Sequence, residues 1–200
     1  MIKALIFDVS GVLTHARFPH AFEAFAHKIN LPSDLVADYF KNDLEKQLLG
    51  QSNLHDIYVS LSEKLDEISE TAFKEKWVST IAEITTINED LLGWIDTWRK
   101  AYTCGILTNN TEGRGIFDQH IQLHSHFDFA LESYKEHIKK PNPEFFKLGL
   151  QYAKCAPNEA LYVDDQQRHV DAAISVGMQG ILFTNNEQLR QDLISHGIKI

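Results

Sequence analysis

The sequence predicts an α/β fold, a doubly wound (Rossmann-like) parallel sheet with an inserted all-helical cap. From residue 88 to the end, short apolar runs alternate with helical patterns, which is typical of a parallel sheet with helices on both faces. Residues 15–86 contain no convincing strand. Their apolar residues recur every three or four positions, as amphipathic helices require.

Four apolar runs are the expected strands, and a fifth run is weaker. Each is short, and several contain β-branched or aromatic residues beside a turn, which suits strands buried on both faces. The four runs are 4–7, 104–107, 160–163 and 180–183, and the weaker one is 127–131. The first follows the initial methionine closely, but Asp8 and the lack of a cleavage-site pattern favour a strand over a signal peptide.

Capping residues predict where several helices begin. Asn88 precedes apolar residues at helical spacing, and Asn142-Pro143 opens another helix with proline at its first position. Two more helices are expected over 170–176 and 189–194. Within the region 15–86, three serines are candidate N-caps: Ser33, Ser52 and Ser69.

These patterns divide the chain into a discontinuous core and a helical insert. Its 200 residues are enough for a hydrophobic core with a small insertion. We expect the core to comprise residues 1–14 and 87–200 and the cap to comprise residues 15–86. No repeat or flexible linker separates the two, so we expect them to be tightly joined.

Composition excludes several classes of partner. The formal net charge is −9, which gives no basic surface for nucleic acid or an anionic membrane. No apolar run approaches the ~18 residues of a membrane-spanning helix. Two cysteines are too few for a disulfide framework and suit a reducing compartment. We therefore expect a cytoplasmic protein, a monomer or weak homodimer, that binds a small molecule.

Polar side chains follow three of the expected strands. Asp8 follows the first, Thr108 and Asn109 the second, and Asp164-Asp165 the strand at 160. Ligands of open parallel sheets gather at the carboxyl ends of the strands, where these residues would meet a lysine of the Lys139-Lys140-Pro141 segment. Three carboxylates together require a cation, and an all-oxygen site with a substrate phosphate favours Mg²⁺.

The sequence resembles the haloacid dehalogenase (HAD) superfamily of hydrolases, in the branch with a helical cap (subfamily I). The resemblance is carried by four motifs in order: FDVSGVLT (7–14), ILTNN (106–110), SYKEHIKKPNPEFF (133–146) and YVDDQQRHVDAA (162–173). With the cap and the order of the helices, it covers essentially the whole chain. It implies a Mg²⁺-dependent hydrolase, expected to be a phosphatase that acts on a small phosphorylated metabolite.

The resemblance also implies roles for individual residues. Asp8 resembles the nucleophile that forms an aspartyl-phosphate, and it would bind Mg²⁺ with the backbone carbonyl of Ser10 and the carboxylate of Asp165. Asp164 would support the metal through a water or a hydrogen bond. Lys140 would pair with both Asp8 and the phosphate.

The resemblance implies a phosphate-binding group as well. Thr108 would hold a phosphate oxygen, helped by backbone N–H groups near Gly11 and Asn109.

Ser10 departs from the family pattern. Most HAD phosphatases have a second aspartate there, which protonates the leaving oxygen and later activates water. Serine cannot do this, and such acid-base help is typically worth ~10²–10⁴-fold in rate. The departure leaves two alternatives open, a weak or inactive phospho-ligand binder and a 2-haloacid dehalogenase. The intact Asp164-Asp165 pair favours the metal-dependent chemistry over dehalogenation.

Two groups of histidines suggest further functional hypotheses. His15 or His20, just beyond the first motif, could replace the missing acid-base group, although a polar hinge residue is the commoner role. His120, His124 and His126 could hold a transition metal with Asp118 or Asp128, but a polar helix end explains them as well.

Overall fold

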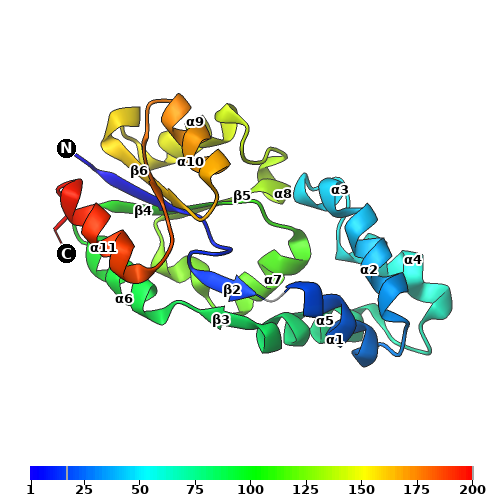
Figure 1. Ribbon diagram of the computed structural model, residues 1–200. Coiled ribbons are helices and arrows are strands. Elements are labelled where there is room, and N and C mark those ends of the chain that lie inside the picture. Colours follow the sequence, from blue (N-terminus) through cyan, green and yellow to red (C-terminus); the bar gives the residue numbers. More distant parts are fainter. Residues whose placement is uncertain (17, 200) are drawn as a thin grey trace.

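The computed structural model describes residues 1–16 and 18–199 and contains the predicted parallel sheet (Figure 1). Its five strands are all parallel and lie in the order β5-β4-β1-β6-β7. They are β1 (Ala4–Phe7), β4 (Thr103–Thr108), β5 (Phe129–Glu132), β6 (Ala160–Asp164) and β7 (Gln179–Leu182). The α/β fold class is confirmed, and all five expected strands lie within two residues of their predicted positions.

Helices cover both faces of this sheet, with α9 and α10 on one side and α6 and α11 on the other (Figure 1). Leu5 and Phe7 of β1 pack into the buried cluster beside α6 and α11, while Ala4 and Ile6 pack beside α9 and α10. This alternation is the two-residue period of a strand buried on both sides. The helices are α6 (Glu89–Trp98), α7 (Glu112–His120), α8 (Ser133–Glu136), α9 (Pro143–Ala153), α10 (Gln167–Ser175) and α11 (Asn186–Ser195).

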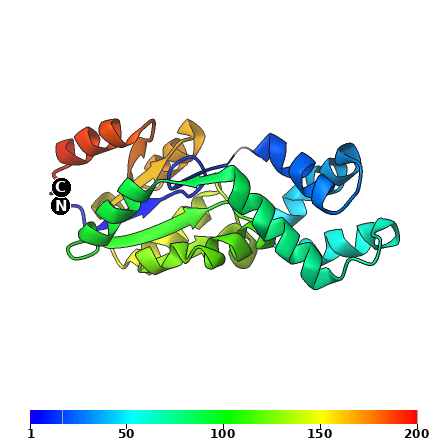
Figure 2. The same cartoon turned by 90° about the horizontal axis from the view of Figure 1, so that it is seen from below.

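Five further helices lie together beyond one end of the sheet (Figure 2). They are α1 (Phe18–Lys28), α2 (Ser33–Asn42), α3 (Leu44–Leu48), α4 (Leu54–Leu61) and α5 (Glu70–Ile84). Aromatic rings fill their shared interior: Phe25 meets Phe73 edge-on with centroids 4.9 Å apart, and Phe40 stacks on Trp77 at 4.5 Å. Phe117 of α7 joins this cluster, so the helical unit and the core share a packed boundary.

Two short strands connect the helical unit to the sheet. Strands β2 (Thr14–Ala16) and β3 (Thr85–Ile87) form an antiparallel ribbon, in which Thr14 pairs with Ile87 and Ala16 with Thr85. The sequence did not predict this ribbon, because three-residue strands leave no readable period and their partners are far apart in the chain. The expected boundaries at 14/15 and 86/87 both fall within it.

The N-cap predictions were partly right. Ser69 caps α5 by accepting from the Ala72 N–H, and Asn88 caps α6 in the same way. Asn142 caps α9, with Pro143 at its first position.

Two of the predicted serine caps were wrong. Ser33 lies inside α2, whose N-cap residue is Pro32. Asn53 caps α4 in place of Ser52, because its side-chain oxygen reaches the N–H groups of both His55 and Asp56. Within the described residues, every helix is too short or too polar to cross a lipid bilayer.

Residues 1–16 and 18–199 also contain three short 3₁₀ turns. They are η1 (Ser62–Lys64), η2 (Leu123–His126) and η3 (Pro157–Glu159). The last of these leads directly into β6, whose carboxyl end carries the Asp164-Asp165 pair.

Candidate active site

The carboxyl ends of β1, β4 and β6 bring the expected site residues to one edge of the sheet. Phe7, the last residue of β1, pairs with Ile106 on one side and Val163 on the other. Asp8 therefore lies level with the end of β6, and its N–H donates to the Val163 carbonyl at 2.9 Å. Adjacent strand ends thus place Asp8 beside Asp164.

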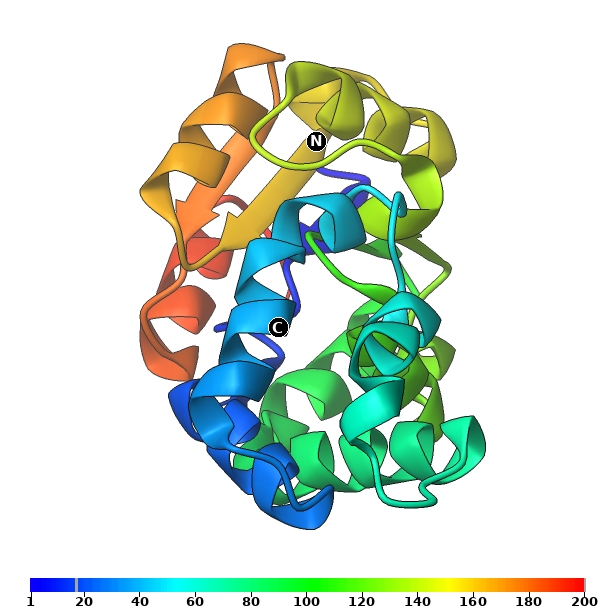
Figure 3. The same cartoon turned by 90° about the vertical axis from the view of Figure 1, so that its right-hand side faces the viewer.

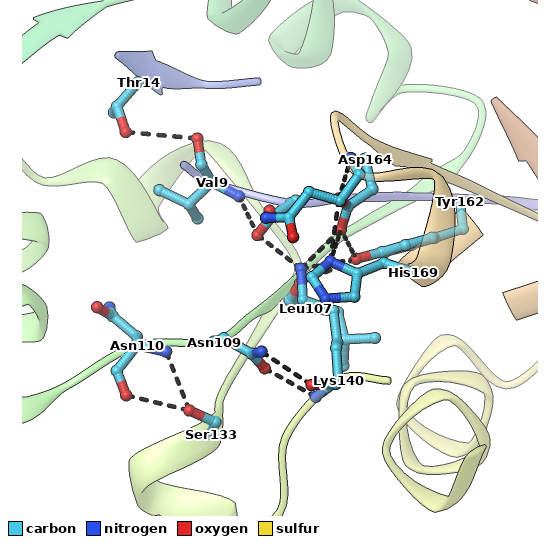
Figure 4. A network of polar contacts seen from close by, with 12 residues as sticks. Val9, Thr14, Leu107, Asn109, Asn110, Ser133, Lys140, Tyr162, Asp164 and His169 are labelled. Atoms are coloured by element: carbon cyan, nitrogen blue, oxygen red, sulfur yellow. Dashed lines mark hydrogen bonds and ion pairs between the residues drawn. The ribbon is translucent and has the colours of Figure 1, made fainter. Parts of the chain in front are cut away.

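Lys140 connects these two carboxylates. Its ammonium nitrogen lies 2.8 Å from Asp8 Oδ1 and 2.8 Å from Asp164 Oδ2, and it also donates to the Tyr162 hydroxyl at 2.8 Å. The contacts with Tyr162 and Asp164 are hydrogen bonds, and the contact with Asp8 is an ion pair. Figure 4 shows Lys140, Tyr162, Asp164 and His169 converging on one point. The side chain of Lys140 has no exposed surface.

Asn109 fixes the backbone of Lys140. Its Oδ1 accepts the Lys140 N–H at 2.7 Å, and its Nδ2 donates to the Lys140 carbonyl at 3.0 Å. The motif after β4 therefore clamps the segment that carries the lysine. The Asn109 side chain both donates and accepts in this contact, which is a role that the sequence did not predict.

Asp164 is surrounded by donors. Its Oδ2 accepts from Lys140 and from the Tyr162 hydroxyl at 2.6 Å, its Oδ1 accepts the Gln166 N–H at 2.8 Å, and His169 Nδ1 lies 3.1 Å from both oxygens. Burial favours a raised pKa for Asp164, but the contacts with His169 and Lys140 outweigh it and hold the pKa below its usual range. With its oxygens occupied in this way, Asp164 is placed to orient Lys140.

Sequence reasoning missed Tyr162 and His169. A tyrosine in a buried strand needs a partner for its hydroxyl, and this was the available signal for Tyr162. His169 lies on the buried face of α10, five residues after Asp164, but nothing in its spacing singled it out. His169 Nε2 is buried and has no hydrogen-bond partner among the described residues.

The pKa values of Asp8 and Asp165 are both raised above the usual carboxyl value. Burial raises the pKa of Asp8 even though Lys140 opposes the shift. Burial and the charges of Asp8 and Asp164 raise the pKa of Asp165 as well. Three carboxylates thus share one lysine, an arrangement that a divalent cation would stabilise.

The turn after β1 places Gly11 directly against Asp165. Gly11 has φ +91°, and a Cβ there would lie 2.3 Å from Asp165 Oδ2, so only glycine fits. Asp8 and Asp165 carry carboxylates and Ser10 a backbone carbonyl, which are oxygen donors of the kind that Mg²⁺ prefers. Among the described residues, the ligand atoms at this edge of the sheet that lie within 4.8 Å of one another are those of Asp8, Asp164 and His169.

For two of the residues expected to bind phosphate, Gly11 and Thr108, the structure shows contacts or burial that do not match that role. The Gly11 N–H donates to the Thr14 carbonyl at 2.7 Å, so this N–H is not free to bind phosphate as the sequence suggested. Thr108 ends β4 and is buried. It is not among the residues that line the cavity described next.

A cavity of about 400 Å³ lies between the sheet edge and the helical unit. Figure 3 views the molecule from the side of that unit, whose helices stand in front of the sheet. The core side of the cavity includes Asp8, Ser10, Asn109, Lys140, Gln166 and His169. The opposite side comes from α1, α2, α3 and α5. His15 and His20 are exposed and lie outside this lining, so neither takes the place of the missing acid-base group here.

A second polar cluster lies beside the cavity. Asp118, His124 and Glu132 offer ligand atoms within 4.8 Å of one another. Arg114 pairs with Asp118 at 3.0 Å, and Lys135 pairs with Glu132, so cations of the chain already balance both carboxylates. His120 and His126 are not part of this group, and the expected set of three histidines is not brought together.

Comparisons with known proteins point to one family of hydrolases. A model of haloacid dehalogenase-like hydrolases matches residues 2–177. Bifunctional epoxide hydrolase 2 of Sus scrofa is 25% identical over 96% of this chain, which spans only 38% of that relative's length. The phosphorylated carbohydrates phosphatase of Thermotoga maritima is 21% identical over 90% of this chain and 84% of its own length.

Solved structures share the fold. A HAD family enzyme of Bacteroides thetaiotaomicron, crystallised with magnesium and inorganic phosphate, has a TM-score of 0.77 and 20% identity, with 94% of this chain and 99% of that chain covered. A 2-haloacid dehalogenase of Pseudomonas syringae has a TM-score of 0.72 and 17% identity, with 99% of this chain and all of that chain covered. At these identities the likeness concerns the fold alone.

Proposed function

The chain belongs to the haloacid dehalogenase-like hydrolases, and on that basis we propose that it is a Mg²⁺-dependent phosphatase of a small phosphorylated metabolite. The observation that carries this proposal is the buried contact of Asp8 with Lys140 at the floor of a cavity. A carboxylate held beside a fixed cation can act as a nucleophile and also tolerate the charge of a phosphoryl group.

Asp8 is oriented for attack through one of its two oxygens. Oδ1 accepts from the Val9 N–H at 2.7 Å and from Lys140, while Oδ2 has no hydrogen-bond partner among the described residues. Oδ2 forms the bond to phosphorus, and the bond between phosphorus and the ester oxygen breaks. The leaving oxygen takes a proton from water, and a second water then hydrolyses the aspartyl-phosphate.

Charge neutralisation is the main task of the remaining residues. Lys140 faces the phosphoryl oxygens from the Asp8 side, held there by Asn109 and Asp164. Asp8, the Ser10 carbonyl and Asp165 would hold Mg²⁺, which neutralises phosphate charge when bound.

The central experiment measures phosphate release with Mg²⁺ from sugar phosphates, nucleotides and activated esters. We expect turnover that Asp8→Asn abolishes. The matched control Asp66→Asn, an exposed carboxylate on the helical unit, should keep full activity. No turnover on any ester, together with thermal stabilisation by the same compounds, would favour a phospho-ligand binder, the alternative that Ser10 motivates. Halide release from a 2-haloacid without metal would favour a dehalogenase.

Ser10→Asp tests the missing acid-base group. The Ser10 side chain lies at the cavity wall, where a carboxylic acid could protonate the leaving oxygen. We expect turnover to rise, with an upper range of ~10²–10⁴-fold for general acid-base catalysis. A variant that folds, binds Mg²⁺ and is no faster would show that the step lost with serine does not limit the rate.

A further inference from the structure

The wall of the cavity opposite Asp8 is built mainly from apolar side chains. Phe22, Phe40 and Trp77 contribute aromatic rings, and Leu44 and Leu48 contribute aliphatic groups. The Phe40 and Trp77 rings stack with an interplanar angle of 16°, and the Phe22 centroid lies 5.4 Å from that of Phe40. This wall is therefore backed by a rigid aromatic stack rather than by mobile side chains.

Leu44 is unusual because 44% of it is exposed although it is a large apolar residue. It begins the short helix α3, and Leu48 lies four residues later on the same helix, so both can face the same side. Both line the cavity. An exposed leucine beside a half-buried one at a cavity is typical of an apolar surface that is covered when a ligand binds.

Polar groups in the cavity are concentrated on the side of the sheet. Asp8, Lys140 and Asn109 belong to the core. On the helical side, the Gln47 side chain already donates to the Phe40 carbonyl, which leaves Lys41 as the charged lining residue of that unit. The cavity thus has one end suited to a phosphate and another suited to an apolar group.

We propose that the substrate is the phosphate ester of an apolar alcohol, with a ring-sized hydrocarbon leaving group, and not a sugar phosphate. This rests on the proposed phosphatase activity. Sugar hydroxyls facing Phe22, Leu44 and Leu48 would lose their hydrogen bonds to water without regaining them. A hydrocarbon ring in the same place would instead be released from water. Carbohydrate specificity, which the name of the Thermotoga maritima relative states, does not suit this wall.

Two esters of matched shape provide the test. Cyclohexylmethyl phosphate and glucose 6-phosphate both join a six-membered ring to phosphate through one CH₂–O bond, and they differ in the polarity of the ring. We expect kcat/KM to be at least about tenfold higher for cyclohexylmethyl phosphate, because even one methylene in an apolar pocket is worth roughly 10–200-fold. An equal or higher kcat/KM for glucose 6-phosphate overturns the proposal.

Substitutions on α3 connect this preference to the wall. Leu44→Ser with Leu48→Ser should lower the ratio of the two kcat/KM values by at least about fivefold. The matched control is Val59→Ser on α4, which removes a 52% exposed apolar residue outside the cavity lining and should leave the ratio as it is. A double variant with an unchanged circular dichroism spectrum and an unchanged ratio would overturn the assignment.

Binding separates this inference from the proposed function. The Asp8→Asn protein is titrated with the same two esters by calorimetry. Tighter binding of cyclohexylmethyl phosphate without any turnover by the native chain supports the apolar subsite and counts against the phosphatase. Turnover of both esters at equal kcat/KM supports the phosphatase and counts against the apolar subsite. Failure of the Asp8→Asn protein to bind cyclohexylmethyl phosphate overturns the apolar subsite.

Discussion

Lys140 is the residue on which the charge balance of the site depends. It is a buried cation with a carboxylate on each side, Asp8 and Asp164, and a phenol as its third acceptor. Removal of one partner from a buried ion pair leaves an uncompensated charge, which costs far more than the pair itself contributes. Lys140 therefore contributes both to the stability of the fold and to the charge balance of the site.

Lys140→Met should destabilise the protein as well as inactivate it. We expect the free energy of unfolding at pH 7 to fall by about 3–5 kcal/mol, because two buried carboxylates lose their counter-charge. The loss should shrink at acid pH, where the carboxylates are protonated. Urea unfolding at several pH values measures both effects. Lys139→Met, at the half-buried neighbour that pairs with the exposed Glu45, is the matched control and should cost no more than ~1 kcal/mol. Equal losses for the two variants would contradict this account.

Asp165 should make Mg²⁺ binding depend on pH. Its pKa is raised by burial and by the charges of Asp8 and Asp164, so protons compete with the cation at a pH above the usual carboxyl range. Mg²⁺ binds the deprotonated form, and its effect is therefore lost as pH falls through the raised pKa. We expect the Mg²⁺-dependent increase in Tm to be larger at pH 7 than at pH 5. An Asp165→Asn protein should show little increase at either pH, and an increase equal to that of the native chain would remove Asp165 from the metal site.

Among single residues, the sequence predicted the charged groups of the site but not the side chains that contact them. Asp8 was found because a carboxylate at the end of a buried strand is chemically conspicuous, and Lys140 because its motif resembles that of the family. The roles of Asn109 and Tyr162 depend on which atoms they meet across the sheet, at sequence separations of 31 and 22 residues from Lys140. No local pattern contains that information. The partner of the Gly11 N–H, the Thr14 carbonyl three residues later, is set by the shape of the turn.

Single elements show which signals are readable in a sequence. Strands β1, β4 and β6 were found because burial on both faces makes them continuous apolar runs. The ribbon of β2 and β3 was missed because three residues carry no period. Ser33 was misplaced as an N-cap because Pro32, which cannot donate a backbone hydrogen bond, already fits the position before the helix.

Ser69 and Ser33 offer a direct comparison of cap energetics. The Ser69 hydroxyl accepts the Ala72 N–H at 3.2 Å, whereas the side chain before α2 makes no capping hydrogen bond. We expect Ser69→Ala to lower the free energy of unfolding by about 0.5–2 kcal/mol, and Ser33→Ala to change it by less than about 0.5 kcal/mol. Urea denaturation of both variants provides the measurement. A larger cost for Ser33→Ala would mean that the cap of α2 has been misassigned.

Across the whole molecule, polar contacts join the helical unit to the core on the side of α3. Lys139, next to Lys140, lies 2.6 Å from a Glu45 carboxylate oxygen. His137 Nδ1 lies 2.9 Å from the Leu49 carbonyl. These contacts are exposed, so each is individually weak. They can break while the buried cluster inside the helical unit remains intact.

Movement of α3 away from this side should be needed for turnover. Cysteines at positions 45 and 139 can be joined by a short bismaleimide in a Cys155→Ser background, since Cys104 is buried and inaccessible. We expect the joined protein to lose at least about tenfold in kcat, because substrate and product must pass between the two units. The Glu45→Cys protein treated with the same reagent controls for the modification. Full activity after joining would show that substrate enters without this movement.

The β2–β3 ribbon places the start and the end of the helical unit on neighbouring strands, which lie about 4.8 Å apart in a sheet. The 68 residues between Ala16 and Thr85 therefore depart from the core and return to almost the same point. For protein engineering, this makes the helical unit a replaceable cassette. Another helical unit can be inserted in its place if the pairing of Thr14 with Ile87 is kept. The new unit would then cover Asp8 and Lys140, while their contacts within the sheet are preserved.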